Sequence, residues 1–261
     1  MKRKPIEKLP LKLPPAIEQF IEGARIFDSS CSPEARVYFI DKDSGYFLKS
    51  AACGTLAKEA MMTEYFHSKK IGTEVLQYHQ GDSDLLLTAR VRGEDCTHPS
   101  YLSDPKRLTD TLAEKLRELH ETDYTGCPVM NRNQDYFKLA ENNFRAKSYD
   151  LTLFGDVFSF RSAEEAYTLM QEGKPAFICD TLLHGDYCLP NIILDGWRLS
   201  AFIDLGNGGV GERHIDIFWG VWTLWFNLHT NKYYDRFLDA YGRDRVDEEK
   251  LRIVAAAEIF G

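Results

Sequence analysis

The sequence has few of the features that mark the commonest metal, membrane and nucleic-acid proteins. None of its six cysteines forms a C-x-x-C pair, so no zinc site is expected and we interpret all six as reduced thiols. No stretch approaches the roughly 18 apolar residues that a membrane-spanning helix needs. A net charge of −8 lacks the basic excess that nucleic-acid binding usually requires. These absences leave an ordinary soluble globular protein as the expectation.

Targeting signals are also missing from the start of the chain. Met1 to Pro5 are mostly charged, and no apolar h-region follows them. We therefore expect a cytoplasmic protein without membrane attachment. The length of 261 residues suffices for one large domain or two modest lobes. A pI of about 5.4 suits a cationic small-molecule substrate, although many cytosolic proteins are this acidic.

The most informative pattern in the sequence is a polar loop in its second half. His184-Gly185-Asp186 precedes Asn191 by five residues, and Asp204-Leu205-Gly206 begins thirteen residues after Asn191. Phosphoryl transfer uses this order, with one carboxylate beside the attacking hydroxyl and two oxygen ligands for Mg²⁺. The alternative is a polar loop in which Asp and Asn only form turns. It would explain each residue separately, but not their order and spacing. The pattern predicts Asp186 as the catalytic carboxylate and Asn191 and Asp204 as metal ligands.

Short apolar runs flank this loop and predict how it is held. Residues 181–183, 192–194 and 199–203 are apolar runs, and Asp195-Gly196 is a hairpin turn signal. We expect three adjacent short strands with the catalytic carboxylate, the Asn and the second Asp at their ends.

Hydrophobic periodicity divides the chain into a strand-rich first part and a mostly helical second part. In the first part we expect helices at 16–23 and 56–67 and strands at 25–27, 35–40, 46–49, 75–79 and 85–91. In the second part we expect helices at 105–120, 136–144, 163–171, 216–227, 233–241 and 248–259. A composition shift at 92–95 predicts lobes at 1–91 and 92–261, with a hinge at about 87–95.

A catalytic loop of this kind needs a phosphate-binding half upstream. Lys49 is the candidate cation, because a lysine on a strand can place its charge on the α- and β-phosphates. Glu59 on the following helix is the expected partner, and Glu64 is the competing alternative. Phe47 points to the same face as Lys49, where it can stack on a purine or pack in the core. The loop at 28–33 contains no G-x-G-x-x-G, but its hydroxyl and N–H groups can cap phosphate oxygens.

With these residues the chain resembles the aminoglycoside 3'-phosphotransferases, antibiotic kinases with a two-lobed fold like that of protein kinases. The resemblance extends over nearly the whole length and includes Ser32-Pro33, Leu48-Lys49, Glu59-Ala60 and Asp216-Ile217 besides the loop motifs. The Cys188 to Asn191 ending of the loop points most narrowly to this family. The resemblance implies an α+β fold, with an N-terminal antiparallel sheet lobe carrying one helix and a larger, mainly helical C-terminal lobe.

The resemblance also implies roles for individual residues. Asp186 would orient the acceptor hydroxyl or accept its proton, Asn191 and Asp204 would bind Mg²⁺, and Asp216 would brace the catalytic loop. Nucleotide contacts would come from Lys49 held by Glu59, from Ser32 on a phosphate, from Phe47 on adenine, and from a hinge at Leu87 to Arg90 that includes Thr88 and Arg90. Acceptor contacts would come from Glu258, from Phe260 and from Asp156 in the loop 147–160.

Four departures from the family concern the acceptor more than the reaction. Asn207 follows the I-D-x-G motif where the family usually has Arg, and Ala257 stands where an Asp is expected. Gly261 moves the terminal carboxylate by one residue, and the helix at 218–227 is aromatic where the family usually offers a carboxylate. Because a polycationic drug binds best among carboxylates, fewer of them imply a narrower drug range or another substrate.

The first hypothesis is therefore a Mg²⁺-dependent transfer of the γ-phosphate of ATP or GTP to the 3' hydroxyl of an aminoglycoside, which would confer antibiotic resistance. We expect the protein to be a monomer or a weak dimer. A kinase of the same fold for another small hydroxylated metabolite is the second hypothesis. A non-catalytic kinase-like binding protein is the third, although the intact Lys49, Asp186, Asn191 and Asp204 argue against it. A protein kinase is weaker still, because we find no A-P-E segment.

Overall fold

The chain folds into two compact α+β units. The computed structural model describes residues 3–31, 33–152, 154 and 158–261. The first unit comprises residues 1–95 and 190–206, and the second comprises residues 96–189 and 207–261. The chain therefore leaves the first unit after Asp95, returns to it at Pro190 and leaves it again after Gly206. The expected mixture of sheet and helix is confirmed.

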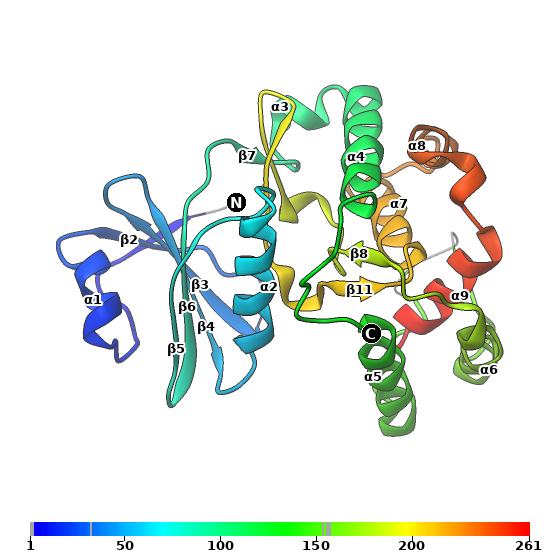
Figure 1. Cartoon of the computed structure of the whole chain (residues 1–261), viewed down its shortest axis with the longest axis horizontal. Helices are drawn as coiled ribbons and strands as arrows, with labels where there is room; N and C mark the ends of the chain where they lie inside the picture. The colour runs from blue at the N-terminus through cyan, green and yellow to red at the C-terminus, as the bar shows by residue number, and fades with distance from the viewer. Residues whose placement is uncertain (1–2, 32, 153, 155–157) are drawn as a thin grey trace. The chain divides into compact units, whose positions relative to one another are not determined.

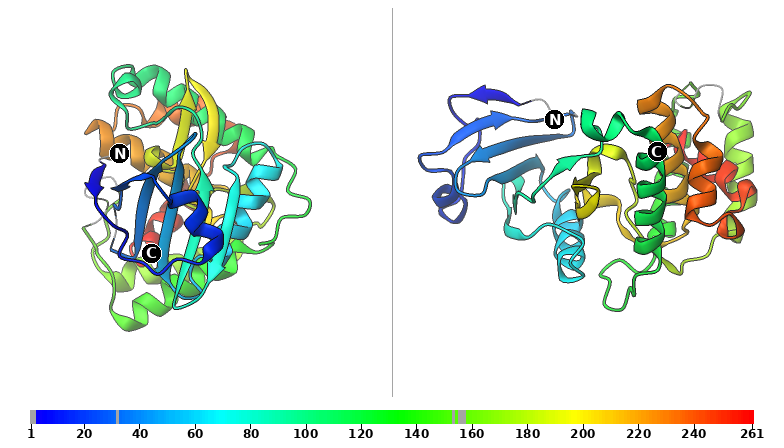
Figure 2. Two further views of the ribbon diagram at one scale, coloured as in Figure 1. Left: turned by 90° about the vertical axis from the view of Figure 1, so that its left-hand side faces the viewer. Right: turned by 90° about the horizontal axis from the view of Figure 1, so that it is seen from above.

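A six-stranded antiparallel sheet forms the body of the first unit, with strand order β1-β2-β3-β4-β6-β5 (Figures 1 and 2). Its strands are β1 (Lys4–Ile6), β2 (Arg25–Asp28), β3 (Ala35–Asp41), β4 (Tyr46–Ala52), β5 (Val75–Gln80) and β6 (Ser83–Ala89). The sequence predicted five of these strands and missed β1, which is only three residues long.

Alternating side chains give this sheet two different faces. Leu85 and Leu87 lie on the face that packs with Leu48 against α1 (Pro15–Ile21) and the chain before it. Leu86 lies on the opposite face and packs with Leu56 and Ala60 at the start of α2 (Ala57–Ser68). The face that α2 covers is also the one that bears Lys49, because Lys49 pairs with Leu86 in the β4–β6 ladder.

A second, three-stranded sheet belongs to the same unit. It contains β7 (Glu94–Asp95), β9 (Ile192–Asp195) and β10 (Arg198–Phe202) in the order β10-β9-β7. The β9–β10 hairpin turns at Gly196 and Trp197, whose φ angles of 57° and 70° suit a two-residue hairpin loop. Pairing of β7 with β9 joins residues 94–95 and 190–206 to the first unit. The unit therefore ends four residues after the boundary expected at 91 and includes a returning segment.

Helices dominate the second unit, and Figure 1 shows α4, α7, α8 and α9 in neighbouring positions. The helices are α3 (Pro99–Leu102), α4 (Pro105–His120), α5 (Arg132–Ala146), α6 (Ala163–Gly173), α7 (His214–Leu228), α8 (Tyr234–Tyr241) and α9 (Glu248–Glu258). Single 3-10 turns are η1 (Lys174–Ala176), η2 (Leu189–Asn191), η3 (Leu205–Asn207) and η4 (Arg243–Arg245). Among the described residues, no helix combines the length and apolar character needed to cross a membrane.

The helix α4 shows why the sequence was a reliable guide to this unit. The Asp104 side chain caps its first turn by accepting a hydrogen bond from the backbone N–H of Arg107 at 3.2 Å. Leu108, Leu112 and Leu116 recur at helical spacing and are completely buried.

The expectation that the three short strands around the polar loop are adjacent was wrong. The strand β8 (Thr181–Leu183) pairs with β11 (Gly209–Gly211), and β9 and β10 belong to a different sheet.

Candidate active site

Lys49 forms ion pairs with two carboxylates in the first unit, and the three charged groups make a triangle. Its Nζ atom is 2.7 Å from Glu59 Oε2, in the first turn of α2, and 2.8 Å from Asp204 Oδ1, just after β10. Burial alone lowers the pKa of Lys49, but the two carboxylates outweigh burial and raise it, so the lysine stays charged. Glu64, the alternative partner, is exposed. The structure therefore selects Glu59.

Asn191 and Asp204 meet at the open end of the β9–β10 hairpin. The backbone N–H of Ile203, next to Asp204, donates to the carbonyl oxygen of Asn191 at 3.0 Å. Asp204 has a left-handed φ of 60°, an uncommon backbone for a non-glycine residue that often marks functional sites. One carboxylate and one amide oxygen fit Mg²⁺, which takes few protein ligands and keeps several waters. In the described part of the chain, no cluster of three or more His, Cys, Asp or Glu side chains offers a competing metal site.

Aromatic rings extend the Lys49 face of the sheet. Phe47, two residues before Lys49, has its ring 5.2 Å from that of Phe39 on β3. The guanidinium of Arg3 lies 3.7 Å from the centre of the Phe39 ring, and that of Arg90 lies 5.7 Å from it. Thr88 is half-buried and pairs with Phe47 across the β4–β6 ladder. Arg3, directly before β1, is a neighbour of these rings that sequence reasoning missed.

Some polar groups of the hinge and of the loop 28–33 already form hydrogen bonds within the protein. The N–H of Ala89 donates to the carbonyl of Glu74 at 3.0 Å, and that of Arg90 donates to the carbonyl of Gly45 at 3.0 Å. A nucleotide base that binds to the backbone of residues 87–90 therefore has to bond to groups other than these two N–H groups. In the loop before β3, the Ser30 hydroxyl accepts from the backbone N–H of Val37 at 3.0 Å. Ser32, the predicted phosphate contact, lies outside the described residues.

The start of α2, and with it Glu59, is held by a residue that sequence reasoning missed. Asp84 on β6 is completely buried, and its carboxylate accepts from the backbone N–H groups of Gly54 at 3.0 Å and Leu56 at 2.8 Å and from the Tyr78 hydroxyl at 3.1 Å. Burial alone raises the pKa of Asp84, but these hydrogen bonds outweigh burial and lower it. The position of Glu59 thus depends on an anion that the local sequence does not mark.

In the second unit, the chain after β8 is fixed to one buried carboxylate. Asp216, in the first turn of α7, accepts from the backbone N–H groups of His184 and Gly185, both at 2.7 Å. His120 Nε2 lies 3.3 Å from the same carboxylate, and His120 Nδ1 lies 2.8 Å from the Tyr241 hydroxyl. Burial lowers the pKa of His120, so this imidazole is neutral. The geometry is that of the brace expected for Asp216, directly before Asp186.

The predicted acceptor residues have different environments. Glu258 accepts from Trp219 Nε1 at 3.0 Å and is buried, and this burial raises the pKa of Glu258 to about 7, with a smaller contribution from the charge of Asp186. The side chain of Phe260 is completely buried against Phe144. The predicted part of Phe260 in acceptor binding stays a prediction, and core packing leaves none of the ring surface exposed in this structure. Asp156 lies outside the described residues.

Burial also controls the thiol of the catalytic loop. Cys188, two residues after Asp186, is buried, and burial followed by the Asp186 carboxylate raises the pKa of the thiol well above its usual range. The raised pKa keeps this thiol protonated and a poor nucleophile. Asp186 itself is partly exposed.

A second buried glutamate lies in the second unit. Glu212 is 3% exposed and contacts His214 Nδ1 at 2.6 Å and Lys250 Nζ at 2.8 Å, so it links the start of α7 to the start of α9. Burial alone raises the pKa of Glu212, but the hydrogen bonds from His214 and Lys250 outweigh it and lower the pKa to about 2. No local motif in the sequence marks this group.

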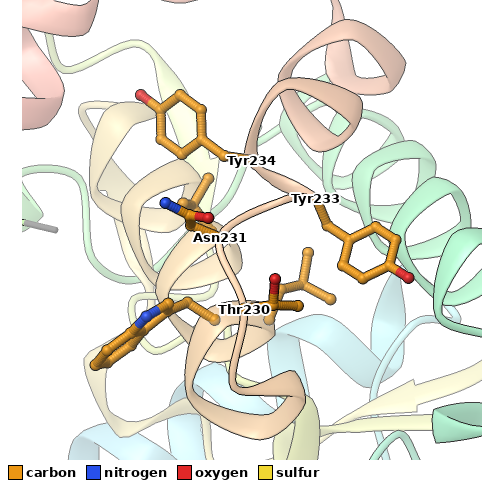
Figure 3. A pocket seen from close by; sticks show the side chains of 7 residues that line it. Thr230, Asn231, Tyr233 and Tyr234 are labelled. Atoms are coloured by element: carbon orange, nitrogen blue, oxygen red, sulfur yellow. The ribbon is translucent and has the colours of Figure 1, made fainter.

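One cavity lies between α7 and α8 (Figure 3), but its volume is only about 10 Å³, room for roughly one water molecule. It is lined by Val221, Leu224, Trp225, Thr230, Asn231, Tyr233 and Tyr234. None of the predicted catalytic or nucleotide-binding residues lines it, so we do not assign it to the active site.

Comparisons with known proteins identify the family and the fold of this chain. Residues 30–253 match the model of the phosphotransferase enzyme family. The chain is 49% identical over 96% of its length to a probable aminoglycoside 3'-phosphotransferase of Lactococcus lactis, of which 95% is covered. Among solved structures, an aminoglycoside-3'-phosphotransferase of type VIII has a TM-score of 0.76 and 22% identity, with 95% of this chain and all of that chain covered. The APH(3'')-Id enzyme of Streptomyces rimosus, in complex with ADP and streptomycin, has a TM-score of 0.68 and 20% identity over 86% and 90% of the two chains. These two structural likenesses identify the fold alone.

Proposed function

Because this chain belongs to the phosphotransferase enzyme family, we propose that it transfers the γ-phosphate of a nucleoside triphosphate to a hydroxyl of an aminoglycoside, at the 3' position. The observation that carries the proposal is the triangle of Lys49, Glu59 and Asp204, with Nζ–carboxylate distances of 2.7 and 2.8 Å. The relative from Lactococcus lactis, a probable aminoglycoside 3'-phosphotransferase, supports the choice of acceptor position.

The residues of the first unit bind the donor. Lys49 places its charge on the α- and β-phosphates, and Glu59 keeps the lysine directed toward them. Asn191 and Asp204 would hold Mg²⁺, whose charge screens the phosphate oxygens. Because Asp204 is already an ion-pair partner of Lys49, these groups share one site. The solved Streptomyces enzyme with ADP supports a nucleotide as the donor, and the choice between ATP and GTP stays open.

The residues of the second unit act on the acceptor. Asp186 orients the acceptor hydroxyl and accepts its proton as the bond to phosphorus forms. The two backbone N–H bonds to Asp216 hold the chain just before Asp186, so the carboxylate needs little reorganisation during transfer. Catalysis then depends on positioning and electrostatics more than on covalent chemistry with the protein.

One observation favours a second candidate function, a kinase for a less cationic hydroxyl compound. Glu258, the predicted contact for an ammonium group, is buried, is bonded to Trp219, and has a pKa raised to about 7 by that burial. A carboxyl group that is about half protonated at neutral pH attracts an ammonium group less than an ordinary glutamate does. A weakly cationic sugar or amino alcohol therefore remains the alternative acceptor.

The test is nucleoside-diphosphate release by the purified protein with Mg·ATP and then Mg·GTP. The acceptors are kanamycin, neomycin, paromomycin, a 3'-deoxy aminoglycoside, choline and simple sugars. We expect turnover with kanamycin and no turnover with the 3'-deoxy compound. Turnover only with choline or a sugar would replace the aminoglycoside with the second candidate, and binding of Mg·ATP without transfer to any acceptor would contradict both.

A further inference from the structure

The first residue of α5 connects that helix to the segment after the D-x-G motif. Arg132 is 5% exposed, and its Nε atom donates to the carbonyl oxygen of Asn207 at 2.7 Å. Its Nη2 atom donates to the Asn207 side-chain oxygen Oδ1 at 3.2 Å. One guanidinium therefore holds both the backbone and the side chain of Asn207, a two-donor grip that a lysine cannot reproduce.

The gripped peptide lies directly against the catalytic loop. A methyl group added at Gly185 would lie 1.9 Å from the Asn207 carbonyl oxygen, so only a glycine allows this approach. Gly185 also has a φ of 83°, which favours glycine. The same carbonyl thus accepts from Arg132 on one side and touches the backbone of Gly185 on the other. Gly185 is bonded to Asp216 through its N–H, so the residue before Asp186 is held by two groups.

The start of α5, which carries Arg132, is itself held by hydrogen bonds. Arg132 occupies the first position of α5, where the Asn131 side chain caps the helix by accepting from the backbone N–H of Gln134 at 3.2 Å. The next residue, Asn133, accepts from the backbone N–H of Glu212 at 2.8 Å and donates to the carbonyl of Ile178 at 3.1 Å. Arg132 therefore extends from a braced helix end to an exposed residue, Asn207.

From these contacts we infer that Arg132 is a positioning residue for Asp186. Its guanidinium fixes the Asn207 peptide, the peptide limits the position of Gly185, and Gly185 sets the direction from which the Asp186 carboxylate meets the acceptor. The inference rests on the proposed phosphoryl transfer. It assigns to a residue of α5, more than fifty positions before the catalytic loop in the sequence, a part in the rate of that transfer.

The experiment compares kcat and the KM for nucleotide of three single variants, with kcat calculated from the concentration of folded protein. Arg132→Lys keeps the charge but loses the two-donor grip, and we expect kcat to fall about ten- to hundredfold while the KM for nucleotide changes less than about twofold. Asn207→Ala keeps the backbone carbonyl and loses Oδ1, so a smaller fall of about two- to fivefold is expected. Arg145→Lys, on the exposed end of the same helix, is the matched control and leaves kcat unchanged.

A double-mutant cycle with Asp186→Asn separates positioning from general stability. If Arg132 acts through Asp186, Arg132→Lys has no further effect on transfer once the carboxylate is gone. Additive losses in the double variant, or a normal kcat for folded Arg132→Lys, would overturn the inference. If the wild-type protein transfers phosphate to no aminoglycoside, that result refutes the proposed acceptor, and the same cycle is then measured on the hydrolysis of Mg·ATP.

Discussion

The two units hold the charges of the candidate site in different ways. In the first, Lys49 and Asp204 neutralise each other through side chains that are 19% and 50% exposed. In the second, the carboxylate of Asp216 is completely buried and is stabilised mainly by backbone N–H groups. Exposed side-chain pairs can exchange partners when a nucleotide and a metal bind, whereas a buried anion bonded to backbone is part of the fold. The comparison predicts that loss of the Lys49–Asp204 pair impairs nucleotide binding, and that loss of the buried Asp216 carboxylate impairs stability.

The largest expected effect comes from Asp216→Asn. The amide offers one acceptor where two backbone N–H groups need one each, and its NH₂ group is left facing a donor. We expect the free energy of unfolding to fall by about 3–5 kcal/mol and transfer activity to be lost with it. Urea denaturation followed by circular dichroism measures the change. An Asp216→Asn variant as stable as the wild type would contradict the claim that the buried Asp216 carboxylate stabilises the fold.

The second effect concerns acid. Because the pKa of Glu212 is lowered to about 2, from an ordinary value of 4.5, its ionised form stabilises the fold above about pH 4.5. This contribution, about 3 kcal/mol, is lost as the pH falls from about 4.5 to 2. Glu212→Gln should lower stability at pH 7 by a similar amount and flatten the loss in acid. Denaturation curves at pH 7, 4 and 3 test this, and parallel pH profiles for the two proteins would contradict it.

A third effect has the opposite sign. Burial raises the pKa of Glu258 from 4.5 to about 7, so ionising this group opposes folding. The fold should lose about 3 kcal/mol as the pH rises from about 4.5 to 7, with no further loss from this group above that range. Glu258→Gln should remove the decline, which unfolding measurements at pH 5 and pH 8 would show. A variant that keeps the whole wild-type decline would mean that Glu258 is not its source.

Local patterns were sufficient to predict most of the fold and the first half of the site. The helix 105–120 was predicted with the bounds that the structure shows, because regularly spaced leucines mark it. The partnership of Lys49 with Glu59 was also predicted, since the strand and the helix that carry them are consecutive in the chain.

What the sequence did not predict depends on contacts between distant segments. The strand β7 has two residues and no periodicity, so only its pairing with β9 defines it. Asp84 and Arg132 look like ordinary strand and helix residues, and their roles follow from partners about 30 and 75 positions away. The complete burial of Phe260 was likewise not predicted, because its partner Phe144 lies on α5, far away in the sequence.

The measurement that tests the account most directly is Mg·ADP binding by calorimetry, set beside transfer kinetics, for Asp186→Asn and Lys49→Met. We predict that Asp186→Asn binds the nucleotide as the wild type does while kcat falls about a hundredfold or more. Lys49→Met should instead bind the nucleotide about tenfold or more weakly while the folded protein stays stable. An Asp186→Asn protein with near-normal turnover, or a Lys49→Met protein with normal nucleotide affinity, would contradict the assignment of donor binding to the first unit and transfer to the second.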